Sequence, residues 1–407
     1  MNVPRVALAF LIGLVGCDVS PVAAPPAGAP PTRGVIVVAY SEGYSSTNVA
    51  YLGWDGALFP SLLASSARPA GLSQALSGNV VVPPDAPAFS GEIVILDRGQ
   101  SVVTWLDPDG ARVKAQLPIA DGFAAFPSDY FEVSATKAYV PRWYNAGSGQ
   151  GDDLVVVDLA LRKVSQTIPL HGLAPGALSA APERIIPAAR PNEAWVVLPR
   201  PRDGAFCDTL DGALARLDTL NDRVIGSETI AGLKNCGGAA RLDEHRIVIA
   251  CAGLVAQQGG CKQLGGGGIV VLRDDGESLV EESRFTAETM GLAGVPLTTA
   301  QGVLIEVAGA DLVVFGALGD GVLGRLDQWF SLDLTTGASS VVEIGHGEAI
   351  KLGDVRCDRA RAACLGADAG KKTLRRYSVR GRTIVEDPPT GYADAYGLLP
   401  FGLGRFQ

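Results

Sequence analysis

Short apolar runs, broken every few residues by Gly, Pro, Asp or Ser, follow one another along most of the chain. The stretch Ala138–Leu170, AYVPRWYNAGSGQGDDLVVVDLALRKVSQTIPL, shows this pattern most completely. It predicts three consecutive strands, at Ala138–Tyr144, Asp153–Asp158 and Lys163–Ile168, separated by a Gly/Ser-rich loop and a short polar turn. This order of elements is typical of antiparallel neighbours in one sheet.

The three-strand pattern recurs seven times, in units of roughly 50 to 60 residues, which is the length of one propeller blade. The first of the three strands in successive units spans Gly34–Gly43, Glu92–Gly99, Ala138–Tyr144, Glu193–Arg200, Arg246–Gly253, Asp311–Gly319 and Ala362–Gly370. In every unit but the seventh, an Asp stands at the turn into the outermost strand, where it can bond its own backbone. These residues are Asp55, Asp107, Asp158, Asp218, Asp274 and Asp333.

With one further strand nearer the axis, each unit makes a four-stranded blade. We therefore predict an all-β fold, a seven-bladed β-propeller with antiparallel blades. The alternative is an open pair of β-sandwiches, which the regular repeat disfavours because sandwiches do not repeat one three-strand pattern. No inner strand is evident before Gly34. The segment Gly391–Leu403 is apolar and is not assigned to any other blade. We predict that this C-terminal segment supplies the inner strand of the first blade and closes the ring.

The N-terminus has the features of an export signal. Arg5 precedes an apolar run, Val6–Val15, which is too short to span a bilayer (about 20 residues). The run ends in Leu-Val-Gly-Cys17, which resembles the lipobox of bacterial lipoproteins. That resemblance implies a signal peptide at residues 1–17, acyl chains such as palmitate on Cys17, and a membrane-anchored protein of the cell envelope or periplasm. The alternative is an ordinary signal peptide with an incidental cysteine.

Residues 18–33 are rich in Pro and Ala and are predicted to form an extended tether, so that the propeller domain is residues 34–407. The anchor would place the domain at the inner membrane, the outer membrane or the cell surface. Charge adds one exclusion: the net charge is −9, and the chain lacks the basic surface that nucleic acid needs.

Six cysteines besides Cys17 predict disulfide bonds, since an even set is typical of exported proteins. Sequence proximity favours Cys357–Cys364 and Cys251–Cys261, which leaves Cys207–Cys236. The alternative is metal ligation, but neither CxxC spacing nor nearby His residues support it. No metal or cofactor is predicted.

The third unit resembles one known repeat. Ala138–Trp143, Leu154–Leu170 and His171-Gly172 are similar to the YVTN (YncE-like) β-propeller repeat. Pro141-Arg142 departs from the usual Thr-Asn, and the other units match in pattern only. The resemblance implies the propeller fold and no specific activity.

The chain reverses direction at each strand of a four-stranded blade. The long loops between the second and third strands of each blade, counted from the axis, therefore lie on the same face as the connections between blades. Loops on a rigid scaffold often carry binding residues, and Arg and aromatic side chains are enriched at contact sites. For Trp143 and Trp329 the alternative is packing between blades. The candidate binding residues of this face are Tyr44, Arg142, Trp143, Tyr144, His171, Arg200, Arg202, Trp329 and His346.

No catalytic constellation is evident in the sequence. The favoured prediction is thus a non-enzymatic, membrane-anchored binding or scaffold propeller that recognises a protein or envelope polymer. The alternative is an envelope enzyme, such as a quinone- or metal-dependent dehydrogenase, lactonase or lyase, with its site at the central channel mouth. A purely structural protein is a third option. A buried cluster of Asp, Glu, Asn or His at the channel would favour the enzyme.

Overall fold

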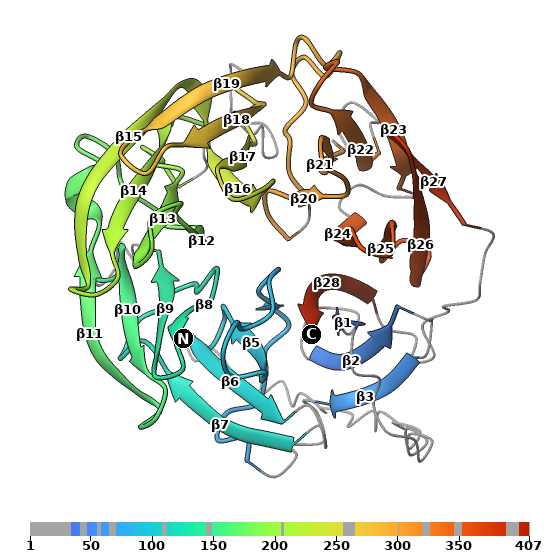
Figure 1. Ribbon diagram of the computed structural model, residues 1–407. Coiled ribbons are helices and arrows are strands. Elements are labelled where there is room, and N and C mark those ends of the chain that lie inside the picture. Colours follow the sequence, from blue (N-terminus) through green and yellow to red (C-terminus); the bar gives the residue numbers. More distant parts are fainter. Residues whose placement is uncertain are drawn as a thin grey trace, which may run out of the picture.

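Seven four-stranded antiparallel sheets stand around a central axis (Figure 1). The computed structural model describes residues 34–40, 47–54, 58–64, 71–107, 112–143, 149–204, 207–254, 265–299, 301–319, 326–345, 352–387 and 399–406. The predicted seven-bladed β-propeller is confirmed.

Each sheet runs from an inner strand at the axis to an outer strand at the rim. The first sheet, which joins both ends of the chain, contains β28 (Leu399–Phe406), β1 (Gly34–Tyr40), β2 (Thr47–Gly53) and β3 (Leu58–Ala64). The next two contain β4 (Val80–Val81), β5 (Ile93–Asp97), β6 (Val102–Asp107) and β7 (Arg112–Pro118), then β8 (Phe131–Ser134), β9 (Lys137–Arg142), β10 (Asp153–Asp158) and β11 (Lys163–Pro169).

The remaining four sheets follow in chain order, and a 3-10 turn, η2 (His171–Leu173), comes directly after β11. The fourth and fifth contain β12 (Arg184–Pro187), β13 (Glu193–Leu198), β14 (Asp211–Asp218), β15 (Arg223–Lys234), and β16 (Cys236–Arg241), β17 (Arg246–Cys251), β18 (Gly268–Asp274), β19 (Leu279–Thr286). The sixth and seventh contain β20 (Ile305–Val307), β21 (Leu312–Ala317), β22 (Gln328–Asp333), β23 (Ser339–Ile344), and β24 (Leu352–Asp358), β25 (Ala363–Asp368), β26 (Thr373–Arg380), β27 (Thr383–Glu386).

The middle strands are buried on both faces because each blade packs between two others. In β10 the first five residues are all buried, whereas in the outer strand β11 only Ile168 is. Leu154 and Val156 of the third blade share one apolar cluster with Ala194 and Val196 of the fourth. This packing explains why the middle strands are continuous apolar runs, which is the pattern that made the repeats visible.

Asp158 and Asp333, at two of the outer turns, have the predicted structural role. Asp158 accepts a hydrogen bond from the backbone N–H of Leu161 at 2.9 Å, and Asp333 accepts one from Thr335 at 2.9 Å. Each carboxylate thus satisfies backbone groups that the chain reversal leaves unpaired.

The ring closes through its two ends, as predicted. β28 pairs with β1 antiparallel, with Gly34 opposite Phe406 and Val37 opposite Leu403 (Figure 1). Leu403 is fully buried and packs with Val35 and Leu52 of its own blade and with Leu365 of the seventh. The strand begins and ends later than the predicted Gly391–Leu403, of which residues 391–398 lie outside the described part of the chain.

Two disulfides join inner strands to their neighbours in the described residues. Cys357–Cys364, between β24 and β25, is the predicted pair. Cys236 bonds Cys251, between β16 and β17, so the predicted Cys251–Cys261 and Cys207–Cys236 pairs are wrong. The hairpin register places Cys236 directly opposite Cys251, and register rather than distance along the chain decides which cysteines meet. Cys207 is disulfide-bonded as well.

Candidate functional site

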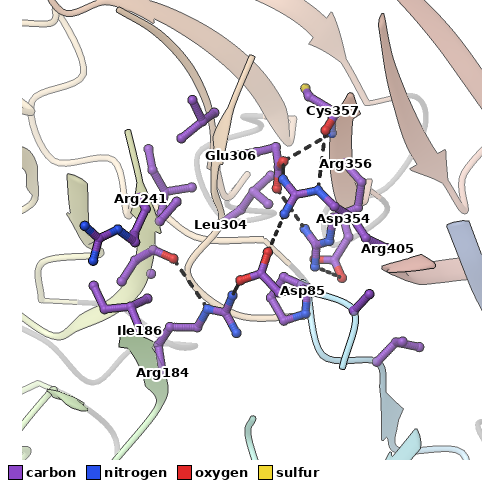
Figure 2. Close-up of a pocket in the computed structure, with 18 of the residues that line it drawn as sticks. Asp85, Arg184, Ile186, Arg241, Leu304, Glu306, Asp354, Arg356, Cys357 and Arg405 are labelled. Atoms are coloured by element: carbon purple, nitrogen blue, oxygen red, sulfur yellow. Dashed lines mark hydrogen bonds and ion pairs between the residues drawn. The ribbon is translucent and has the colours of Figure 1, made fainter. Parts of the chain in front are cut away.

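The inner strands of all seven blades line a central channel with a cavity of about 740 Å³. This volume lies within the range of small-molecule sites, roughly 300 to 1,000 Å³. The lining is unusually rich in charge for a space enclosed by strands. Its ionisable side chains include Arg98 and Glu183. Figure 2 shows six more, namely Asp85, Arg184, Glu306, Asp354, Arg356 and Arg405.

Arg184, the first residue of β12, makes ion pairs with two carboxylates. Its Nη1 lies 2.6 Å from Oδ1 of Asp129, and its Nη2 pairs with Asp85. Asp129 is fully buried and also accepts the backbone N–H of Ile185 at 2.8 Å. Asp129 is therefore a buried partner of the guanidinium that is also tied to the backbone at the start of β12.

Arg405 of β28 lies across the channel from Arg184 and pairs with Asp85 and with Glu306 of β20 (Figure 2). Arg356 of β24 lies beside it, with its Nη2 3.2 Å from Oδ2 of Asp354. Asp354 also accepts the backbone N–H of Leu403 at 3.1 Å. Charges from blades far apart in the sequence thus form one network at the axis.

Burial and charge move the pKa values of these carboxyls in different directions. Burial raises the pKa of Asp129 and of Asp354, although neighbouring arginines oppose the rise. The pKa of Asp85 is lowered, because Arg184, Arg405 and Arg356 together outweigh its desolvation. The position of the Asp85 carboxylate is therefore one where the channel favours negative charge.

Glu183 and Arg98 also line the channel. Glu183 directly precedes β12, and burial raises the pKa of its carboxyl to about 7, with Asp129 adding to the rise and Arg98 opposing it. In the described part of the chain, the Glu183 carboxylate has no hydrogen bond or ion pair. Arg98 donates from Nε to the carbonyl of Pro127 at 3.4 Å and from Nη1 to that of Gln301 at 3.2 Å.

Both residues lie at the end of the channel that opens on the predicted binding face. Arg98 directly follows β5, the second strand of its blade, and Glu183 directly precedes an inner strand. The partners of Arg98, Pro127 and Gln301, lie in connections between blades. The sequence placed function on this face but did not identify these two residues.

Two of the predicted binding residues, Trp329 and Arg142, are buried. Trp329 is fully buried, donates from Nε1 to the carbonyl of Gly353 at 3.2 Å, and packs edge-on against Tyr377. It therefore packs between blades, as the alternative held, and is not available to a partner. Arg142 is also buried, in a two-bond ion pair with Asp153 at 2.7 and 2.6 Å. Its role is to join β9 to β10.

Other candidates lie on or near the surface. Trp143 is half-buried, Arg202 is exposed and pairs with Asp208 at 3.6 Å, and Arg200 bonds the carbonyl of Asp211. His171 is exposed and its Nδ1 lies 2.8 Å from Oδ2 of the buried Asp152. The other predicted residues lie outside the described part of the chain. These are the binding candidates Tyr44, Tyr144 and His346, the lipidation site Cys17, and Cys261.

Within the described ranges, no group of three or more His, Cys, Asp or Glu side chains is arranged to hold a metal ion. No helix in that part of the chain is long and apolar enough to cross a bilayer.

The channel residues carry a weak sequence signal. Glu306 interrupts the apolar strand Ile305–Val307, and Asp354 and Arg356 interrupt Leu352–Asp358. A charge inside a strand that faces the axis is a sign of a polar channel. The signal is scattered because each blade contributes only one inner strand, so no short motif collects the site.

No family model matches the sequence, and no curated protein matches it. The fold is similar to solved propellers. The periplasmic gluconolactonase PpgL of Pseudomonas aeruginosa has a TM-score of 0.59 at 13% identity, over 92% of this chain and 99% of that one. A putative 6-phosphogluconolactonase of Bacteroides fragilis has a TM-score of 0.58 at 11% identity, over 92% and 98%.

A hypothetical selenium-binding protein of Sulfolobus tokodaii has a TM-score of 0.56 at 9% identity, over 94% of both chains. These proteins carry different functional names on one architecture. At such identities the likeness shows a shared propeller fold and nothing more specific, so any assignment of function must rest on the channel residues.

Proposed function

We propose that the protein is a hydrolase that opens the ring ester of small hydroxylated lactones inside the central channel. One observation carries this proposal: the Glu183 carboxyl opens into the channel without a hydrogen-bond partner in the described residues, and its pKa is about 7. A general base works best when its pKa lies near the operating pH. The charged cluster also meets the condition set for the enzyme alternative.

The proposed step uses groups at one end of the channel. Glu183 takes a proton from a water molecule as the water oxygen bonds to the lactone carbonyl carbon. The guanidinium of Arg98, whose Nη2 donates no hydrogen bond among the described residues, stabilises the negative charge on the carbonyl oxygen. When the ring C–O bond breaks, the leaving oxygen takes the proton from Glu183. The net reaction adds one water molecule to the lactone and gives the open-chain hydroxy acid.

The lactonase-like fold neighbours agree with this chemistry, but the proposal does not depend on them. A partner protein or envelope polymer on the loop face stays a prediction. The hydrolase would use the same face as its entrance, because Glu183 and Arg98 lie at that end.

We further propose that the protein is a YncE-like lipoprotein of the envelope, anchored through Cys17. The disulfides support an oxidising compartment. Cells that express the full chain and are fed an alkyne-labelled palmitate should yield a labelled protein in the membrane fraction. The Cys17→Ala variant should lose the label, and labelling that persists in this variant would refute the anchor.

The proposed hydrolysis has a defined pH dependence. Only the ionised Glu183 can accept a proton, so kcat/KM for the lactone should rise with pH and level off above a midpoint of about 7. Release of acid from five- and six-membered sugar lactones, corrected for spontaneous opening, measures this on residues 34–407. A profile that is flat between pH 5.5 and 8, or no hydrolysis across the panel, would exclude the proposed function.

A further inference from the structure

The β4–β5 loop, residues 82–92, carries a side chain into the middle of the channel. The corresponding loop of the third blade spans only residues 135–136, and that of the seventh only residues 359–362. The longer loop is anchored at both ends. The backbone N–H of Arg405 donates to the carbonyl of Pro84 at 3.1 Å, and Glu132 accepts the backbone N–H groups of Phe89 and Ser90 at 2.7 and 2.9 Å.

From this loop, Asp85 reaches between Arg184 and Arg405, as Figure 2 shows. Its side chain is 58% exposed and faces the cavity, whereas that of Arg184 is only 9% exposed. The two guanidiniums are thus built into the wall of the channel, and the carboxylate that joins them comes from a loop.

Both arginines keep a second carboxylate that does not depend on Asp85. Arg184 pairs with Asp129, which is fully buried, and Arg405 pairs with Glu306, which is 2% exposed. If Asp85 were withdrawn, neither guanidinium would remain an unpaired buried charge, which is what usually makes the loss of an ion pair costly.

Two guanidiniums that converge on one carboxylate have the geometry that proteins use to bind carboxylate and phosphate groups. The lowered pKa of Asp85 agrees with this, since it shows that the point between them favours negative charge. The neighbouring Arg356 adds to the positive potential there.

We propose that Arg184 and Arg405 form a binding site for the carboxylate or phosphate group of a small ligand, and that Asp85 occupies this site when the ligand is absent. This site rests on the proposed function in one respect only. If the protein hydrolyses lactones, its substrate is a lactone that carries a carboxylate or phosphate group. Both arginines and Glu183 line the same cavity of about 740 Å³.

The test compares anion binding by wild type, Asp85→Asn and Asp121→Asn. Asp121→Asn removes the same charge at an exposed position outside the cavity lining. Calorimetric titrations use gluconate and inorganic phosphate at constant ionic strength, with sorbitol as the neutral probe. The two anions distinguish a carboxylate site from a phosphate site.

Because a tethered carboxylate competes at a high effective concentration, Asp85→Asn should bind at least one anion at least tenfold more tightly than wild type. Asp121→Asn should match wild type, and sorbitol should bind to none of the three. A folded Asp85→Asn protein whose anion affinity is unchanged or weaker would overturn the site.

Thermal melts decide the case in which Asp85→Asn fails to fold. Asp85→Ala is then the second variant, and phosphate at 100 mM should restore a cooperative melt by taking the vacant position. Failure of phosphate to restore either variant would also overturn the site. Since none of these measurements needs turnover, anion binding can stand if lactone hydrolysis is absent, and hydrolysis can stand if anion binding is absent.

Discussion

Removal of residues 399–407 should abolish the cooperative unfolding of the whole ring rather than fray one end. The deletion removes β28, which leaves the inner edge of β1 unpaired and takes the fully buried Leu403 out of the contact between the first and seventh blades. It also removes Arg405, so that Glu306 loses an ion pair in a buried position. The free energy of unfolding of a folded domain is only about 5 to 15 kcal/mol. Breaking a buried ion pair alone costs about 3 to 5 kcal/mol, which is a large part of that total.

Circular dichroism melts and size-exclusion chromatography measure this effect, with loss of the melt and aggregation through the open edge expected. The register supplies a rescue control. Phe406 and Gly34 are paired neighbours, so Leu399–Phe406 placed before Gly34 through a two-residue Asn-Gly turn should restore the melt. A truncated chain that melts cooperatively at the wild-type temperature would show that the ring does not depend on this closure.

Glu183→Gln should lower kcat/KM for the lactone by about a hundredfold or more, which is the usual contribution of a general base. The amide keeps the size of the side chain but cannot accept the proton from water. The remaining activity should also lose the rise with pH near 7 that the wild type shows. Assays of acid release across pH 5.5 to 8 give both results.

The stability of the same variant separates a catalytic role from a structural one. The pKa of Glu183 is raised from its ordinary 4.5 to about 7 in the folded protein, so the folded state holds this proton more tightly than the unfolded state does. Ionisation of Glu183 therefore costs stability as pH rises from about 4.5 to 7, and that cost persists above 7. At pH 8 Glu183→Gln should melt at the wild-type temperature or above it.

The exposed Glu288→Gln is the matched control and should change neither activity nor melting. Wild-type kcat/KM in Glu183→Gln would remove Glu183 from the mechanism. A large drop in melting temperature would instead assign it a structural role.

The fold could be predicted from the chain because each middle strand is covered on both sides by neighbouring blades. That environment demands a continuous apolar run, such as Val155–Val157, and an Asp turn after it, such as Asp158, in unit after unit. Ring closure was predictable for a related reason: an unpaired inner edge in the first unit requires a partner, and only the C-terminal segment was free to supply one. These features are local, and a local pattern is visible in the sequence.

The site could not be predicted in the same way. Glu183 and Arg98 come from different blades, and Asp85, Arg184 and Arg405 meet only because the ring brings inner strands together at one axis. For Trp329 the sequence left two roles open, since an aromatic residue near a long loop is equally suited to a surface or to the contact between blades, and the structure shows the contact between blades. The predicted disulfide partners of Cys236 and Cys251 were wrong because the register of a hairpin is a property of the folded sheet.

The sequence by itself thus determined the repeating unit, the number of blades and the way the ring closes, since burial between blades acts on every unit alike. Only the tertiary structure decided which charges share the channel, which of them have fixed partners, and that burial raises the pKa of Glu183. These properties depend on distances and desolvation between residues that are far apart along the chain, and no spacing in the sequence encodes them.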